Sequence, residues 1–337
     1  MKKNHLHFPK ASLLFFLLLL SIAYFQACKN NETETKKPST PSATTPAPDI
    51  KVPTFNADSA YQFVAKQVSF GSRVPGTTAH DQCGQWLQTK LGSYADSIFI
   101  QEAPVSFFDK KTTMKNIIGT FNTTATRRIL LLAHWDSRLY ADQDTDEKNH
   151  NQPVMGANDG ASGVGVLLEI ARQLQQSPIS KNLGVDILLV DAEDNGNNGG
   201  NWCLGSQHWA KNPHVPNYKA EFGILLDMVG AKDAVFNVEG YSAYFAPRVV
   251  QKVWSTANKI GYSSYFQLKQ VNEIIDDHFY INDIAKIPTI DIIQYDPSVR
   301  EKGFPEHWHT VHDTMENIDK NTLKAVGQTV LTVLYNP

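Results

Sequence analysis

Residues 128–137 read RILLLAHWDS, an apolar run that ends in a histidine and an acid. Its consecutive Ile, Leu and Ala residues suit a strand that is buried on both faces, as in a parallel sheet covered by helices. Comparable apolar runs occur at 116–121, 185–191, 223–226 and 289–293. The sequence therefore predicts a central sheet of buried, largely parallel strands.

Helical segments alternate with these runs. In residues 162–175 the apolar side chains recur at the i, i+3, i+4, i+7 spacing of an amphipathic helix, and residues 320–335 repeat this pattern. Strands that alternate with helices are typical of the α/β class. We expect residues 53–337 to form a single α/β domain, a three-layer α/β/α sandwich with a mixed, largely parallel central sheet.

The first 27 residues have the order of a secretory signal: lysines, then the apolar run 11–25, then Ala27 directly before Cys28. A run of about 15 residues is too short for a spanning helix, which needs roughly 20. A cysteine at this place resembles the lipid-attachment signal of bacterial lipoproteins, although Phe25 replaces the usual aliphatic residue. We expect residues 1–27 to be a lipoprotein signal peptide. The exported protein would then be held at the membrane only by the lipid on Cys28, facing the periplasm or the cell surface.

Residues 28–52 are rich in Thr, Pro and Ser and have no apolar period, which predicts a flexible tether. In the whole chain 31 Lys+Arg stand against 34 Asp+Glu, a net charge of −3. This balance offers no basic face to nucleic acid, so no nucleic-acid partner is expected. Beyond Cys28 the chain has only Cys83 and Cys203, too few for a disulfide framework, and the sequence leaves their pairing open.

Metal-binding residue types stand where three predicted strands end. RILLLAHWDS ends with His134, ILLVDAEDNG with Glu193 and Asp194, and ILLDMVGA contains Asp227. In open α/β sheets the carboxyl ends of the strands form the ligand crevice. We therefore expect these side chains to lie close together.

Two loops add residues of the same kind, Asp159 in GANDGASG and His309 in EHWHTVHDT. Carboxylates and imidazoles are ligands that Zn²⁺ selects, at roughly 2.0 to 2.2 Å. Taken alone, Asp159 would also suit the N-cap of the helix that follows it. The order and spacing of the whole set are more specific than any single residue.

The complete set of motifs resembles the zinc-dependent glutaminyl cyclases, a branch of the zinc aminopeptidase superfamily that makes N-terminal pyroglutamate. The resemblance runs from Ser69 to the C-terminal helix. In order, the motifs are AHWDS, GANDGASG with LLEIARQL, VDAEDNG, LGSQHWA, LLDMVGA, IDDHFYI, IPTIDII and FPEHWHTVHDTMENID.

Carried over residue by residue, the resemblance implies that Asp159, Asp194 and His309 are the ligands of one zinc ion. It makes Glu193 the general acid and base. The family usually has Glu where this chain has Asp194, whose side chain is one methylene shorter.

The same resemblance implies a hydrogen-bond network around Glu193 that includes Asp227 and Asp276. Trp308 and Phe304 correspond to the aromatic wall of the substrate pocket. Trp202 is a further pocket residue, in a loop that differs in length from the animal enzymes.

The chemistry of cyclisation agrees with these roles. The α-amine of an N-terminal glutamine must attack its own side-chain amide and expel ammonia, so peptides or proteins with N-terminal glutamine would be the partners. Zinc with an open position can polarise the amide carbonyl. A carboxylate that takes and returns the proton is commonly worth about 10² to 10⁴ in rate.

The main alternative is a two-zinc aminopeptidase of the same superfamily, with His134 at the second-metal position. The acid pair before His278, which includes Asp276, and Trp308 directly before His309 favour the cyclase. A third class, a binding domain that has lost catalysis, is less favoured because no ligand is missing.

Overall fold

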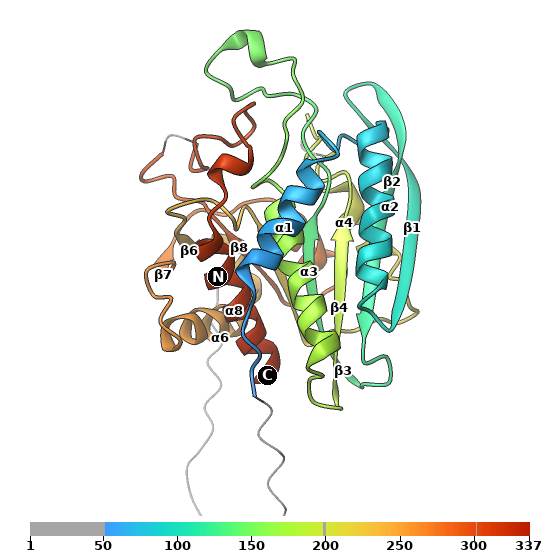
Figure 1. Ribbon diagram of the computed structural model, residues 1–337, viewed down its shortest axis with the longest axis vertical. Helices are drawn as coiled ribbons and strands as arrows, with labels where there is room; N and C mark the ends of the chain where they lie inside the picture. The colour runs from blue at the N-terminus through green and yellow to red at the C-terminus, as the bar shows by residue number, and fades with distance from the viewer. Residues whose placement is uncertain (1–50, 198–199, 301) are drawn as a thin grey trace, which may run out of the picture. The chain divides into compact units, whose positions relative to one another are not determined.

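The computed structural model describes residues 51–197, 200–300 and 302–337 (Figure 1). Its main sheet has six strands in the order β1-β2-β4-β3-β5-β8. These strands are β1 (Ser97–Phe107), β2 (Lys110–Phe121), β3 (Arg127–His134), β4 (Leu183–Val190), β5 (Phe222–Asp227) and β8 (Thr289–Ile293). Strands β4, β3, β5 and β8 run parallel, whereas β2 pairs antiparallel with β1 and β4. The predicted mixed, largely parallel sheet is confirmed.

Each of the five predicted apolar runs forms a strand of this sheet. Strand β2 begins at Lys110, before the apolar run, because its first half pairs only with β1. Strand β1 lacks a continuous apolar run because it lies at the sheet edge and most of its residues are partly exposed. Burial on both faces therefore explains which strands the sequence reveals.

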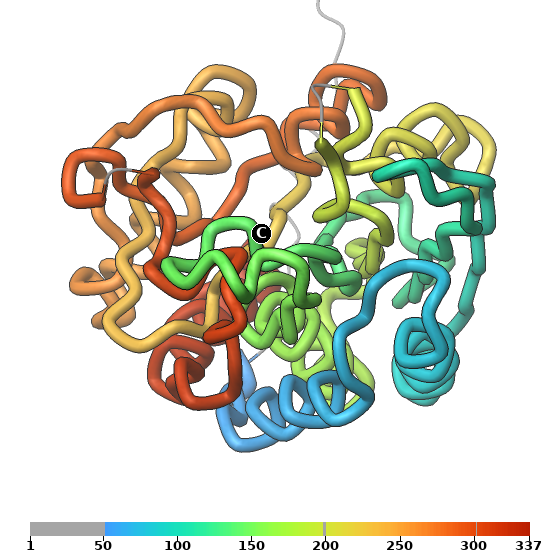
Figure 2. Tube along the Cα trace, turned by 90° about the horizontal axis from the view of Figure 1, so that it is seen from above, coloured from blue at the N-terminus to red at the C-terminus, as the bar shows by residue number. Residues whose placement is uncertain are grey.

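Helices cover both faces of the sheet and give the predicted three layers (Figure 2). One apolar cluster unites the sheet with α1 (Ala57–Val68), α2 (Thr78–Gly92), α3 (Ala161–Gln176), α6 (Pro247–Lys259) and α8 (Lys320–Tyr335). A second cluster, on the other face, contains residues of α4 (Leu204–Lys211) and α7 (Asp277–Asp283). The remaining short helices are η1 (Glu147–Asn149), α5 (Gly240–Phe245) and η2 (Met315–Asn317).

Strand β3 shows how the alternation of side chains joins the two clusters. Ile129 and Leu131 belong to the larger cluster, and Leu130 and Leu132 belong to the smaller one. All four side chains are fully buried. Burial of each stabilises the fold by roughly 1.5–3 kcal/mol. The strand that carries His134 is thus fixed from both sides.

A separate pair of short parallel strands, β6 (Phe236–Val238) and β7 (Phe266–Gln270), lies outside the main sheet. The indole of Trp254 donates to the carbonyl oxygens of Phe236 and Gln267 and ties this pair to α6.

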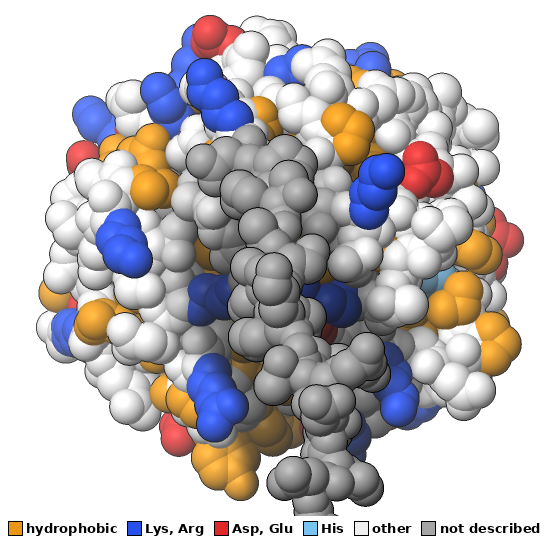
Figure 3. Space-filling model, turned by 90° about the horizontal axis from the view of Figure 1, so that it is seen from below, with side chains coloured by type: hydrophobic (Ala, Val, Ile, Leu, Met, Phe, Trp, Pro, Cys, Tyr) orange, Lys and Arg blue, Asp and Glu red, His pale blue; other side chains and the backbone are white. Residues whose placement is uncertain are grey.

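Seen from below, the molecule carries scattered Lys and Arg side chains and small apolar patches (Figure 3).

The predicted signal peptide, residues 1–27, and all but the end of the predicted tether lie outside the described residues. Within the described ranges no helix is both long and apolar enough to cross a membrane. Cys83 and Cys203 are both free thiols, which answers the pairing question that the sequence left open.

Candidate metal centre

The candidate site lies at the carboxyl ends of three adjacent parallel strands. His134 ends β3, Asp227 ends β5, and the turn after β4 carries Glu193 and Asp194. Asp159 comes from the turn before α3. The strand ends that the sequence predicted to meet do meet, because β3 lies between β4 and β5 in the sheet.

Three buried side chains form the first ligand group. The Nε2 atom of His309 lies 2.8 Å from Oδ1 of Asp194 and 3.5 Å from Oδ2 of Asp159. One nitrogen and two carboxylate oxygens therefore converge on one point, with all donor atoms within 4.8 Å of one another. This donor set fits Zn²⁺, which takes imidazole and carboxylate ligands.

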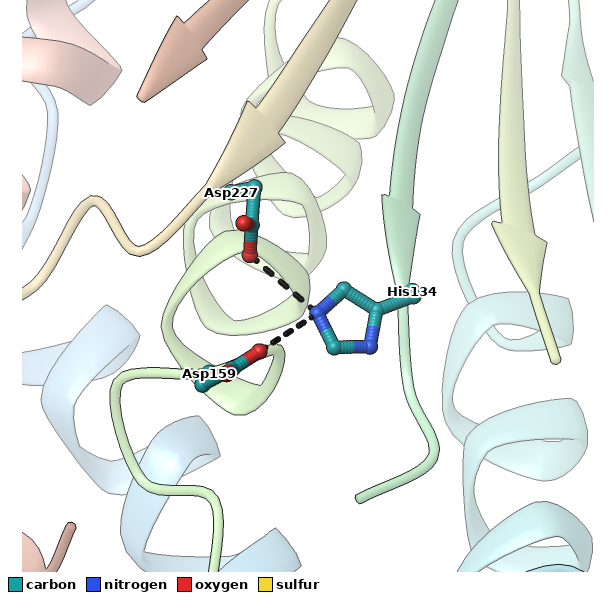
Figure 4. Close-up of side chains that lie close together, drawn as sticks. All are labelled: His134, Asp159 and Asp227. Atoms are coloured by element: carbon teal, nitrogen blue, oxygen red, sulfur yellow. Dashed lines mark hydrogen bonds and ion pairs between the residues drawn. The ribbon is translucent and has the colours of Figure 1, made fainter. Parts of the chain in front are cut away.

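A second group shares Asp159 with the first. The Nε2 atom of His134 lies 2.9 Å from Oδ1 of Asp159 and 3.1 Å from Oδ1 of Asp227 (Figure 4). Burial alone would lower the pKa of His134, but hydrogen bonds with Asp136, Asp159 and Asp227 outweigh it and raise the pKa well above its ordinary value. Since the two carboxylate oxygens of Asp159 face different histidines, the residue joins both groups.

Asp136 organises the turn after β4. Its carboxylate accepts the backbone N–H of Glu193 at 3.1 Å and that of Asp194 at 3.2 Å. The side-chain amide of Asn195 donates to the same carboxylate at 3.0 Å. These bonds fix where Glu193 and Asp194 leave the main chain.

Arg138 and Asp142 support the ligands from a second layer that the sequence did not reveal. The Arg138 guanidinium donates to the carbonyl oxygen of Asp194 at 2.8 Å and pairs with Asp142 at 2.6 Å. Asp142 in turn lies 3.6 Å from Nδ1 of His309. Carboxylates behind a ligating histidine set its orientation. The only sequence signal for this role is that Asp142 begins the polar stretch 142–152.

Asp313 holds the Asp159 turn and was also missed. Its carboxylate accepts the backbone N–H of Asn158 at 2.8 Å and that of Asp159 at 3.0 Å. Burial, with the nearby charge of Asp159, raises the pKa of Asp313 to about 7. The peptide bond between Asp159 and Gly160 is cis.

Glu193 stands beside the ligand groups with further acids behind it. Its side chain is 13 % exposed, and its Oε2 atom lies 4.0 Å from Nδ1 of His134. Donor atoms of Glu193, Cys203 and Asp276 lie within 4.8 Å of one another. Burial raises the pKa of Glu193 well above its ordinary value, and the charges of Asp276, Asp194 and Asp277 add to the rise. The Glu193 carboxyl therefore binds a proton more tightly than an exposed glutamate does.

The acids behind Glu193 are themselves buried. Burial raises the pKa of Asp276, and it raises the pKa values of Asp277 and Asp291 well above their ordinary range. Burial also raises the pKa of Asp227 to about 7. The sequence pointed to Asp227 and Asp276, and the structure adds Asp291 from β8.

Aromatic side chains flank His309. The ring of Trp308 stacks on it with centroids 3.8 Å apart, and Phe304 stacks on Trp308 at 4.3 Å. The ring of Trp202 is parallel to that of His309, with a centroid distance of 6.5 Å. The Arg138 guanidinium lies 4.9 Å from the centroid of the Trp202 ring. All three predicted pocket residues therefore gather at the first ligand group.

Four residues in or beside the site have left-handed backbone conformations. Ala192, Cys203, Met228 and His309 have φ values of 53°, 54°, 47° and 54°. For residues other than glycine this region costs on the order of 1–3 kcal/mol each. The surrounding packing holds these residues in place, as is common where side chains are aimed at a functional centre.

The sequence profile described as Peptidase family M28 matches residues 116–334. A glutaminyl cyclase of Bacteroides thetaiotaomicron, solved with N-acetylhistamine, is similar at 52% identity. The match covers 85% of this chain and 100% of that chain, with a TM-score of 0.82.

A protein described as a leucine aminopeptidase precursor from the same species is similar at 51% identity. It covers 86% of this chain and 99% of its own, with a TM-score of 0.81. The glutaminyl-peptide cyclotransferase of Gloydius blomhoffii is 28% identical over 248 residues, 64% of this chain and 63% of the relative. The chain thus spans slightly less than two thirds of the length of that curated relative.

Proposed function

Because this chain belongs to peptidase family M28, we propose that it uses the family's site for a reaction other than hydrolysis: it converts the N-terminal glutamine of peptides or proteins to pyroglutamate and releases ammonia. The likeness to bacterial glutaminyl cyclases at about half identity over their whole chains supports this reaction.

The observation that carries the proposal is the position of Asp276 beside Glu193. Glu193 and Asp276 offer donor atoms within one cluster 4.8 Å across, and Asp277 and Asp291 lie buried behind them. Ionisation of one of these buried carboxyls disfavours ionisation of its neighbours, so the group retains protons. Such a reservoir suits a reaction in which a proton moves from an amine to a departing ammonia on the same substrate.

Asp159, Asp194 and His309 would hold one zinc ion. When bound, zinc supplies Lewis acidity toward the γ-carbonyl oxygen of the substrate glutamine. The second-layer contacts of Asp142, Arg138 and Asp313 keep these ligands oriented without help from the metal.

Glu193 would move the proton. Its carboxylate takes a proton from the attacking α-amine and returns it to the leaving nitrogen, which departs as ammonia. The raised pKa of the Glu193 carboxyl makes it a stronger base than an ordinary glutamate, and its partial exposure leaves it accessible to the substrate. Asp276, whose charge contributes to this raised pKa, and Asp227 would be the acids around Glu193.

Trp308 and Phe304 would orient the substrate. The ring closes only when the glutamine side chain is folded back on its own amine. Binding in that conformation lowers the activation barrier, because the entropy of orienting the groups is lost on binding and not in the reaction step. The stacked rings beside His309 provide flat apolar surfaces for the methylene groups of glutamine.

A two-zinc aminopeptidase is the second candidate, and one observation favours it. His134, Asp159 and Asp227 form a further group of converging donors, and Asp159 belongs to both groups. In that case the protein would release glutamine from a Gln-initiated dipeptide by hydrolysis.

One experiment separates the two candidates. The purified protein is given a Gln-initiated dipeptide, and the products are resolved as ammonia with pyroglutamyl peptide, or as two free amino acids. We expect the first outcome, with activity lost to a chelator and restored by zinc, and one zinc per chain by metal analysis. Free glutamine as the main product, with two zinc ions, would establish the aminopeptidase instead.

We also propose that the protein is exported and anchored by a lipid on Cys28, in agreement with the sequence of its first 28 residues. The lipid would keep the enzyme at the membrane, where it meets peptides and proteins that have been exported or taken up from outside.

A further inference from the structure

Cys203 contacts the Glu193 carboxyl, but the proposed reaction assigns no role to this cysteine. Its Sγ atom lies 3.3 Å from Oε1 of Glu193. The cysteine side chain is fully buried. The other carboxylate oxygen, Oε2, is the one that lies 4.0 Å from His134, toward the ligand groups.

Backbone hydrogen bonds fix the contact between Cys203 and Glu193. The backbone N–H of Cys203 donates to the carbonyl oxygen of Glu193 at 3.0 Å, and that of Leu204 donates to Ala192 at 3.0 Å. The N–H of Gly205 donates to Asp191 at 2.9 Å. A Cβ on Gly205 would lie 2.3 Å from the Asp191 carbonyl oxygen, so only glycine permits this close approach. The start of α4 is therefore bound in register to the turn that carries Glu193.

The thiol also lies close to a second acid. Glu193, Cys203 and Asp276 each offer an atom within 4.8 Å of the others, so the sulfur lies close to both carboxyls. Burial raises the pKa of the Cys203 thiol well above its ordinary value, and the charge of Glu193 raises it further. The thiol keeps its proton, which makes it a hydrogen-bond donor and a poor nucleophile or metal ligand.

We propose that Cys203 is a positioning residue for Glu193: its S–H donates to Oε1 and holds the carboxyl so that Oε2 faces the substrate amine. This inference rests on the proposed function, since it assigns Glu193 the proton transfer. Without the donor, the carboxyl could rotate toward Asp276 or bind a water molecule, and fewer substrate complexes would have the reacting atoms aligned.

Three variants of the zinc-loaded protein test the proposal. Cys203→Ala removes the donor, Cys203→Ser keeps one, and Cys83→Ala is the matched control, because Cys83 is an equally buried thiol in α2. With a Gln-initiated dipeptide, we expect Cys203→Ala to lower kcat about tenfold, the size of one hydrogen bond to a charged group. Its KM and zinc content should stay unchanged.

The serine variant should retain kcat to within about threefold of the unaltered protein, because its hydroxyl can replace the thiol as donor. The Cys83→Ala control should keep its kcat. A kcat of Cys203→Ala within twofold of the unaltered protein would overturn the proposal. So would a serine variant as slow as the alanine variant, or a loss of zinc in Cys203→Ala that accounts for the lost rate.

The S–H infrared band tests the contact separately from the reaction. The band of Cys203 is isolated by subtracting the spectrum of Cys203→Ser, and we expect it to shift in Glu193→Gln because a carboxylate acceptor has become an amide. An unshifted band would refute the hydrogen bond. If the unaltered protein forms no pyroglutamate but the band shifts, the proposed function fails while the contact stands.

Discussion

At Glu193, substitution by glutamine removes proton transfer while it keeps the shape of the side chain. Glu193→Gln keeps the volume of the side chain and the backbone bonds to Asp136, but the amide cannot carry the proton. We expect the variant to bind zinc normally and to lose about 10² to 10⁴ in kcat. Zinc analysis and steady-state rates on the same preparation measure both properties. Near-normal turnover would mean that another group is the base.

Trp308 contacts both a ligand and a second aromatic ring, so its substitution tests which contact matters. If Trp308 forms the substrate wall, Trp308→Ala should raise KM about tenfold, which is 1.4 kcal/mol, with zinc retained. Retention is expected because Asp142 and Arg138 also support the first ligand group. Zinc content, melting temperature and KM on this variant decide the matter. Unchanged KM with reduced zinc would assign Trp308 to packing against His309 alone.

Asp313 should make the zinc-free protein less stable as the pH rises. Its pKa is about 7 when folded, against an ordinary value of 3.8, so the folded state binds this proton more tightly. The contribution to stability is therefore complete below about pH 4 and is lost as the pH rises through about 7. Asp313→Asn is neutral throughout and should lack this loss. The melting temperatures of the unaltered protein and of Asp313→Asn, both freed of zinc by a chelator, would show this difference between pH 4 and 8. If the two melting temperatures change with pH in the same way, the prediction is wrong.

Among the secondary-structure elements, α3 follows the turn that carries Asp159 and packs closely against β5. A Cβ on Gly163 would lie 2.1 Å from the carbonyl oxygen of Leu226 in β5. We expect Gly163→Ala to lower the free energy of unfolding by about 1–3 kcal/mol, the usual cost of overpacking. Thermal unfolding measures this change.

The matched control for this change is Asn258→Ala, at an exposed position of α6, which should stay within about 0.5 kcal/mol. If the two variants are equally stable, the contact between α3 and β5 is looser than the structure indicates.

The elements that the sequence predicted are those with the simplest surroundings. Strands β3, β4, β5 and β8 are buried on both faces, so the sequence of each is an apolar run. Strand β1 was not predicted, because this edge strand alternates exposed and partly buried residues. The short β6 and β7 strands escaped because they have too few residues to show a period.

The same difference separates the predicted from the missed residues of the site. His134, Glu193, Asp194 and Asp227 could be placed because strand ends share one edge of a parallel sheet. The support from Asp142 depends instead on how two loops far apart in sequence meet. Gln143 donates its backbone N–H to His309 at 3.1 Å, and Val311 donates its own to Asp144 at 3.1 Å. No periodicity encodes such contacts.

At the scale of the whole molecule, the described residues 51–197, 200–300 and 302–337 form one unit that contains every proposed ligand. The sheet, its two helical layers and every proposed ligand lie within this unit. We therefore expect the chemistry to need only residues within this unit, and the predicted lipid anchor to affect location.

This separation predicts that the lipid can be removed without loss of catalysis. When the full chain is expressed in a bacterium fed labelled palmitate, the unaltered protein should carry label and sediment with membranes, whereas Cys28→Ala should carry none. Cys83→Ala, the matched control, should be labelled normally, because that thiol is buried in the folded body. The purified Cys28→Ala body should keep the kcat and melting temperature of the unaltered protein. Label that persists in Cys28→Ala, or an unaltered protein without label, would show that residues 1–28 serve another purpose.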